Sequence, residues 1–70
     1  MIPADSAHIA WDSKKKNWIV SIQAGGDVIK RQPETHVAHD APDDLLRATA
    51  IQTVKDDGYD VTPERVDIVR

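Results

Sequence analysis

The stretch of sequence that decides the fold is AHIAWDSKKKNWIVSIQA, residues 7–24. Residues 7–11 and 18–24 alternate between apolar and polar side chains with a period of two, which is typical of strands that are buried on one face. The basic run between them, residues 13–16, has the length of a hairpin loop. We therefore expect a β-hairpin.

The apolar pattern also indicates the register of this hairpin. Residues that lie opposite one another in an antiparallel pair share a face of the sheet, and a shift by one residue would mix the apolar and polar sets. With a four-residue loop, one face collects Trp11 opposite Trp18, Ile9 opposite Val20, and Ala7 opposite Ile22. The other face carries Asp12 opposite Asn17, Ala10 opposite Ile19, and His8 opposite Ser21.

Gly25-Gly26 indicates a second tight turn, because such turns need positive φ angles. The strand that follows, residues 27–32, is compatible with two registers. A two-residue loop and a three-residue loop place different residues on the tryptophan face: Ile29 with Arg31, or Val28 with Lys30.

Because neither register separates apolar from charged residues, we interpret residues 27–32 as an edge strand. Pro33 is expected either to end this strand or to introduce a bulge in it, since proline cannot donate a hydrogen bond to a neighbouring strand. Residues 35–39 either form a loop or resume an extended strand, in which Val37 would point inward.

A helix is predicted over residues 41–57. Asp40 is the expected N-cap, Pro42 suits the first turn, and Gly58 supplies the left-handed residue that ends the helix. The apolar stripe with helical spacing consists of Leu46, Ala50, Ile51 and Val54.

After the helix, residues 62–65 read as a turn or a single tight helical turn, and residues 65–69 as a final strand. The predicted fold class is therefore α+β, in the order β-β-β-α-β, with one helix on one face of an antiparallel sheet of three or four strands. Residues 1–6 are expected to form a flexible tail and residues 7–70 a single small domain. The expected core is Ile9, Trp11, Trp18, Val20, Ile22, Leu46, Ala50, Val54, Tyr59, Val66 and Ile68.

Composition narrows the function classes. The 70 residues include no cysteine, which removes disulfides, thiolate chemistry and Cys-based metal sites. No apolar run approaches the roughly 18–20 residues of a membrane span, and residues 1–6 lack the basic and apolar regions of a signal peptide. We expect a soluble cytoplasmic protein with no cofactor and no membrane partner.

The net charge of −3 is unevenly distributed. Residues 1–39 carry five basic and four acidic side chains, whereas residues 40–70 carry four basic and eight acidic ones. The strand-rich half is mildly basic and the helical half is acidic, so the chain as a whole lacks the basic character that is typical of nucleic-acid-binding domains.

The basic hairpin loop is the first candidate site. Lysines beside aromatic rings can follow a phosphate backbone while the rings stack on bases, and Trp11 and Trp18 flank this loop. The predicted register, however, directs both tryptophans to the core, and a solvated turn explains the lysines equally well. The candidate contacts for nucleic acid are Lys14, Lys15, Lys16, Lys30 and Arg31.

Acidic residues near both ends of the helix form the second candidate, a face for a basic partner. Those of the first turn are favoured by the helix dipole, but those of the last turn are not. The residues of this candidate face are Asp43, Asp44, Asp56 and Asp57.

Metal binding and catalysis have less support in the sequence. His36, His39 and Asp40, with His8, are metal-ligand types, but residues three apart on an extended chain point to opposite sides. Gly25-Gly26 joins two strands and precedes no helix, unlike a phosphate-binding loop. We predict no catalytic, cofactor-binding or metal-binding residue.

The layout of three strands followed by a helix, over residues 7–57, resembles the small DNA-binding modules of phage-type integrases and plant AP2 domains. The acidic helix and the added final strand depart from that layout, and no diagnostic motif matches. The resemblance therefore transfers no residue roles.

The first functional hypothesis is a non-enzymatic protein-interaction module, with self-association along a strand edge as one form of it. The alternative is a nucleic-acid-binding module that uses the basic hairpin loop.

Overall fold

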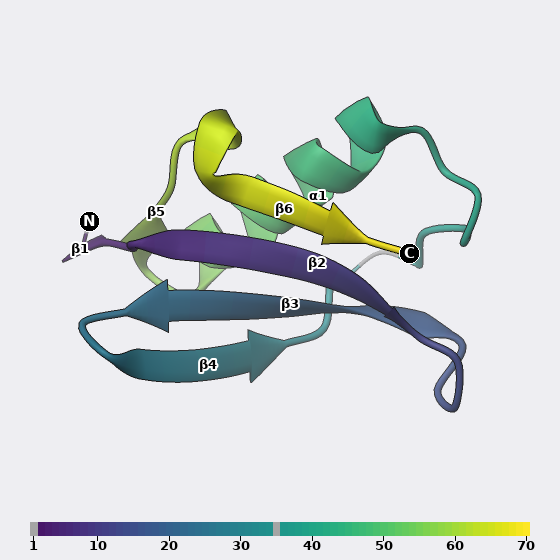
Figure 1. The fold of residues 1–70 in the computed structure, drawn as a ribbon, viewed down its shortest axis with the longest axis horizontal. Coiled ribbons are helices and arrows are strands. Elements are labelled where there is room, and N and C mark those ends of the chain that lie inside the picture. The colour runs from purple at the N-terminus through teal and green to yellow at the C-terminus, as the bar shows by residue number, and fades with distance from the viewer. Residues whose placement is uncertain (1, 35) are drawn as a thin grey trace.

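The predicted hairpin forms the centre of a four-stranded sheet (Figure 1). The structure is a computed structural model that describes residues 2–34 and 36–70. It confirms the α+β class, with one helix against a mostly antiparallel sheet. Across the sheet the strands are β4 (Asp27–Arg31), β3 (Asn17–Ala24), β2 (Ser6–Asp12) and β6 (Val66–Val69).

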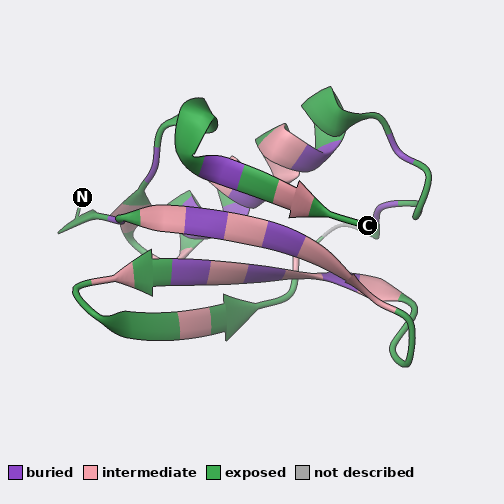
Figure 2. Ribbon diagram, in the orientation of Figure 1, coloured by how far each residue is buried: buried purple, intermediate pink, exposed green. Residues whose placement is uncertain are grey.

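The β2–β3 pair has the register that the sequence predicts, from Ala7 opposite Ile22 to Asp12 opposite Asn17. Burial alternates along both strands, as the buried and half-buried bands in Figure 2 show. Ile9, Trp18 and Val20 are wholly buried, because their common face lies under the helix. Burial of this face supplies the hydrophobic free energy that holds the hairpin.

The register of β4 is the one that a two-residue turn imposes. Gly25 and Gly26 both have positive φ, 58° and 89°, as a tight hairpin turn requires. Ile22 consequently lies opposite Ile29 and Val20 opposite Arg31, so the odd-numbered residues of β4 share the tryptophan face. β4 is an edge strand, as predicted, and it ends two residues before Pro33.

The last strand differs from the antiparallel sheet that we expected, since β6 pairs with β2 in parallel. Parallel strands need a long crossover, and α1 (Asp43–Asp56) provides it between β4 and β6. At 1.5 Å per residue, 14 residues of helix span about 21 Å, which is enough to return the chain along the sheet to its other edge.

The helix begins three residues after Asp40, which is not its N-cap. Pro42 takes that position, with φ −66° and ψ 153°, and no side chain caps the helix. Proline disfavours helical geometry in the residue that precedes it, so Ala41 cannot start the helix. The predicted end is correct to within one residue: Asp57 is the C-cap, and Gly58 has φ 89°.

The buried face of α1 contains most of the predicted stripe. Leu46, Ala50 and Val54 are buried, and Ile51 is half-buried against the core. Thr53 is buried as well, although it is not part of the predicted apolar stripe. Its burial is tolerated because its hydroxyl donates a hydrogen bond to the Thr49 carbonyl at 2.8 Å. The helix lies behind the sheet in Figure 1 and packs on β2, β3 and β6.

Residues 2–6, which we expected to be part of a flexible tail, are paired in the structure. β1 (Ile2–Pro3) lies parallel to β5 (Tyr59–Asp60), and Ala4 is buried. The backbone N–H groups of Ala4 and Asp5 donate to Asp60 and Gln23 carbonyls, both at 2.7 Å. Met1, the first residue of that expected tail, lies outside the described residues.

The remaining segments complete the core. Pro63–Arg65 forms the predicted tight helical turn, a 3₁₀-helix labelled η1. Among the described residues of 35–39 there is no strand, but Val37 points inward and is buried, whereas Thr35 lies outside the described residues. The buried apolar residues are Ala4, Ala7, Ile9, Trp18, Val20, Ile22, Val37, Ala41, Leu46, Ala50, Val54, Val61 and Val66, with Trp11, Tyr59 and Ile68 half-buried beside them.

Within residues 2–34 and 36–70, α1 is the one α-helix, and it is too short and too polar to cross a membrane.

Trp18 is the largest wholly buried side chain, so Trp18→Ala should lower the free energy of unfolding by about 3–5 kcal/mol. Chemical denaturation measures this change. Leu45→Ala is the control, because Leu45 is 49% exposed and should lose no more than about 0.5 kcal/mol. Equal effects of the two substitutions would contradict the packing of the helix on the hairpin.

Candidate functional site

One face of the sheet carries no covering layer in the part of the chain that the structure describes, and we call it the open face. Side chains alternate between the two faces of a strand, so the residues between the buried ones point away from α1. The open face consists of Ser6, His8, Ala10 and Asp12 from β2, Asn17, Ile19, Ser21 and Gln23 from β3, Val28 and Lys30 from β4, and Asp67 and Val69 from β6.

The registers arrange the centre of the open face in two rows that cross the strands. The first row is polar and runs through Asp67, His8, Ser21 and Lys30. His8 Nδ1 lies 4.0 Å from the Asp67 carboxylate in this row. The second row is apolar and contains Val69, Ala10 and Ile19. Val69 is 53% exposed, so part of this apolar row is accessible to a partner.

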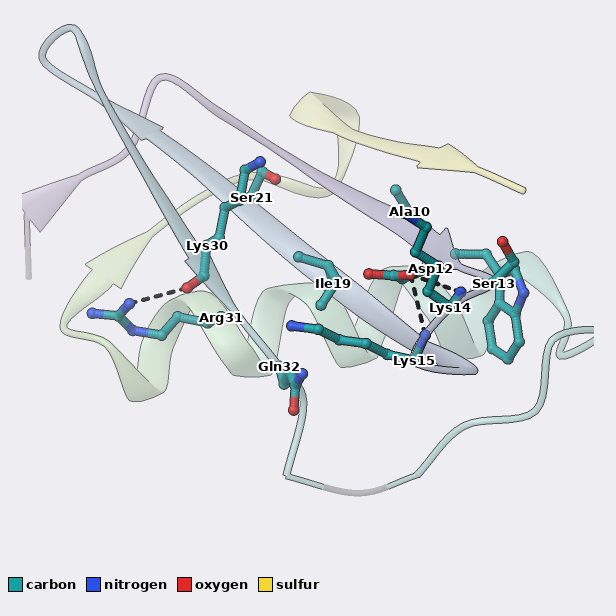
Figure 3. A pocket seen from close by; sticks show the side chains of 11 residues that line it. Ala10, Asp12, Ser13, Lys14, Lys15, Ile19, Ser21, Lys30, Arg31 and Gln32 are labelled. Carbon is teal, nitrogen blue, oxygen red and sulfur yellow. Dashed lines mark hydrogen bonds between the residues drawn. The ribbon is translucent and has the colours of Figure 1, made fainter.

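An open hollow of about 670 Å³ lies at the end of this face nearest the lysine loop. Ile19 lies near its middle, with Lys15 and Lys30 on different sides of it (Figure 3). The Asp12 carboxylate accepts the backbone N–H groups of Lys14 and Lys15, at 2.9 and 3.2 Å. Such a turn orders the start of the loop and thereby positions these two lysines at the hollow.

The fold brings together most of the five predicted basic residues. Lys14, Lys15, Lys30 and Arg31 line the hollow, whereas Lys16 does not. Arg31 has a different role: its Nε donates to the Asp57 carboxylate at 3.0 Å and its Nη1 to the Lys30 carbonyl at 3.0 Å. The free positive charge at the hollow therefore comes from the three lysines.

The two tryptophans do not form a stacking platform on the open face. Their rings meet edge to face, with centroids 5.3 Å apart, and the His39 ring packs on Trp11 at 4.5 Å. Trp18 Nε1 also donates to the Ala38 carbonyl at 3.2 Å. The loop before α1 thus covers the tryptophan end of the core, and the rings are engaged within the protein.

Arg70 holds that loop in place. Its guanidinium donates to the carbonyls of His39 and Ala41, at 2.9 and 2.7 Å, and to the Asp43 carboxylate at 2.7 Å. One side chain therefore ties β6 to both the loop and the first turn of α1. The sequence pattern does not predict this contact, because it joins residues that are far apart in the chain.

The four acidic residues do not form one surface. Asp43 and Asp44 lie in the first turn of α1, whereas Asp56 and Asp57 lie at its other end. Three of them contact a side chain of the protein itself: Asp43 binds Arg70, Asp57 binds Arg31, and Asp56 accepts a hydrogen bond from Gln52. The helix therefore presents two separate acidic ends, each partly occupied.

The histidines are also dispersed. His8 lies beside Asp67 on the open face, and His39 stacks on Trp11. His36 lines a separate hollow near Leu45. Among residues 2–34 and 36–70, no three His, Asp or Glu side chains are grouped in a way that could hold a metal ion.

Comparisons of the chain with protein-family models, curated proteins and solved structures found no match. The candidate site is therefore defined by its own geometry: a hollow on an uncovered sheet face, apolar at its centre and bordered by lysines.

The sequence pattern contained one signal for the apolar centre that the predicted site residues omit. Ile19 and Ala10 fall opposite each other on the polar side of the predicted hairpin. Single apolar residues on the solvent side of a strand are common, whereas adjacent ones that form a patch can mark a contact surface.

Replacing Arg70 should loosen the loop that covers the tryptophans. We expect Arg70→Gln to lower the free energy of unfolding by about 1–2 kcal/mol, since it removes charge-assisted hydrogen bonds from a group that is 39% exposed. The tryptophan emission should shift to longer wavelength. Lys55→Gln, on the exposed side of α1, is the control and should change neither the free energy of unfolding nor the emission wavelength. An unchanged emission in Arg70→Gln would contradict the role of Arg70 in holding the loop over the tryptophans.

Proposed function

We propose that this protein is a non-enzymatic interaction module that binds a protein partner through the open face. The observation that supports this most directly is the hollow around Ile19, on a face that no element of the described residues covers. Two exposed large apolar side chains, Val28 and Val69, also lie on this face, so a partner can gain apolar contact there.

The chemistry of the hollow favours a partner that carries apolar and acidic side chains together. Ala10 and Ile19 offer an apolar floor, and Lys14, Lys15 and Lys30 contribute three ammonium groups against the single carboxylate of Asp12. Opposite charge at the rim of an interface increases the rate of encounter and selects orientation, while the apolar centre provides most of the affinity.

A cytoplasmic location is part of this proposal. The absence of cysteine suits a reducing compartment, where a small domain depends on its apolar core instead of disulfides.

A capture experiment with a matched pair of variants tests the open face. Immobilised protein is exposed to an extract of its source cells, and bound proteins are quantified by mass spectrometry. Ile19→Asp should lose at least about 90% of a specific partner, because it removes the apolar contact and places a carboxylate beside the lysines that an acidic partner would need. Leu45→Asp makes a similar change on the exposed surface of α1 and should retain the partner.

If Leu45→Asp lost the partner and Ile19→Asp kept it, the result would indicate that the interface lies at the hollow beside the loop before α1 and not on the open face. Equal capture by both variants and the wild type would reject the open face as the binding surface.

Nucleic-acid binding is a second candidate, and one observation favours it: the fold places Lys30 beside Lys14 and Lys15 at one hollow. Two features make it the weaker candidate. Trp11 is among the residues that line the hollow, but its ring is already packed against Trp18 and His39, and Arg31 is engaged with Asp57. Stacking on bases would thus have to come from elsewhere.

Fluorescence anisotropy with generic duplex DNA and RNA at low salt tests this candidate. Binding through three lysines should weaken with salt, with a logarithmic slope of roughly −2 to −3. Changing Lys14, Lys15 and Lys30 to Glu should abolish it. The control changes Lys16, Arg47 and Lys55 to Glu, which alters the net charge by the same amount and should preserve most of the binding. If the wild type does not bind at low salt, nucleic-acid binding is rejected.

A further inference from the structure

The outer edge of β4 has no strand beside it in the part of the chain that the structure describes. Unpaired edges carry free backbone donors and acceptors that can pair with another chain. β4 contains neither a proline nor a bulge, and Pro33 follows only after the strand has ended. Its protection consists of its short length and its charged residues Asp27, Lys30 and Arg31, which disfavour an arbitrary neighbour but not a strand of complementary charge. This edge is therefore available for strand pairing.

The turn between β3 and β4 determines which backbone groups face that edge. A two-residue turn makes its flanking residues, Ala24 and Asp27, a pair that exchanges both hydrogen bonds. Bonded and non-bonded pairs then alternate, so Ile29 and Arg31 also bond to β3. The N–H and C=O groups of Val28 and Lys30 point to the free edge. The Lys30 carbonyl is indeed reached by Arg31 Nη1, at 3.0 Å.

We propose that β4 pairs with β4 of a second copy of this chain, antiparallel and centred on Ile29. In this register Val28 lies opposite Lys30 of the second copy, and each pair exchanges two backbone hydrogen bonds. In each copy, the four outward backbone groups, the N–H and C=O of Val28 and of Lys30, thus all gain a hydrogen-bond partner. The Lys30 carbonyl has a second lone pair, so it can accept from the partner while it keeps its bond from Arg31.

The side chains of β4 are complementary to themselves in the same register. Asp27 lies opposite Arg31 of the second copy on both sides of the axis. Arg31 uses Nε for Asp57 and Nη1 for the Lys30 carbonyl of its own chain, so Nη2 is the group with which it would reach the Asp27 carboxylate. Lys30 lies opposite Val28, whose side chain is exposed and can pack along the aliphatic part of the lysine. A shift of the register by two residues would lose the pairing of Asp27 with Arg31.

Ile29 supplies the apolar contact on the axis. It packs on the edge of the core and remains half-buried, because α1 lies over β2, β3 and β6 more than over β4. Two Ile29 side chains would meet across a non-bonded pair, the arrangement in which opposite side chains lie closest. The core of each copy would then continue into the other.

This interface goes beyond the proposed function, since it uses the strand edge; it shares the side chains of Val28 and Lys30 with the open face but leaves Ile19 uncovered. The contact is smaller than a standard interface of about 800 Å² per partner, so the dimer should dissociate on dilution. Sedimentation velocity of the full chain, from roughly 10 μM to 1 mM, should give a mass that rises from one copy towards two.

Proline substitution tests the strand pairing selectively. Val28→Pro removes an N–H that points to the free edge and leaves the bonds to β3 intact. It should raise the dissociation constant of the dimer at least about tenfold, because one intermolecular bond is lost from each copy. Val28→Ala keeps the N–H and should change the constant less than about threefold. Far-UV circular dichroism checks that both variants fold.

A charge exchange tests the register without altering the backbone. Asp27→Arg alone sets arginine against Arg31 of the second copy, and Arg31→Asp alone sets two aspartates together, so each variant should dimerise at least about fivefold more weakly than the wild type. A mixture of the two variants restores both opposite-charge contacts and should form a heterodimer with near wild-type affinity.

A wild-type mass that stays at one copy up to about 1 mM would overturn the proposed dimer. Equal dimerisation of Val28→Pro and the wild type would do the same, and failure of the mixture to associate would overturn the register. Ile19→Asp should still dimerise, so loss of a partner at the open face and loss of self-association are separate results.

Discussion

The structure depends on the pairing of β2 with β3 in a single register. That pairing sets Trp11 against Trp18 and places Ile9, Val20 and Ile22 on the same side of the sheet. A shift by one residue would turn these side chains towards water and leave α1 with no apolar surface to cover. A chain of 70 residues buries only about 60% of the surface that its unfolded chain exposes, less than a larger domain does, so it cannot compensate for the loss of this one layer.

Once that face is chosen, the rest of the chain completes it. α1 covers the centre, the loop before it covers the tryptophan end, and β6 extends the sheet beside β2. Arg70 joins the loop, the helix and the last strand through three hydrogen bonds from a single guanidinium. In the part of the chain that the structure describes, the single α-helix covers one face of the sheet, and the other face has no covering layer.

The surfaces that remain have different chemistry. The open face combines a small apolar centre with lysines, which suits a partner that is apolar and acidic. The β4 edge offers backbone hydrogen bonds and a self-complementary order of charges, which suits a second copy. Because the two surfaces do not overlap at Ile19, one molecule can use both at once, and a dimer would present two hollows on one continuous sheet.

The sequence by itself determined the hairpin register, the fold class, the end of the helix at Gly58 and most of the core, because period-two alternation, helical spacing and glycine conformations are local properties of the chain. Its prediction for the helix start was wrong, since Pro42 disfavours helical geometry in the residue before it.

Tertiary structure alone decided that β6 runs parallel to β2 and that residues 2–6 are paired. It also decided that Lys30 joins Lys14 and Lys15 while Arg31 turns to Asp57. Each of these depends on contacts between residues that are far apart in the chain. No local pattern records such contacts, because their energy exists only when the layers pack together.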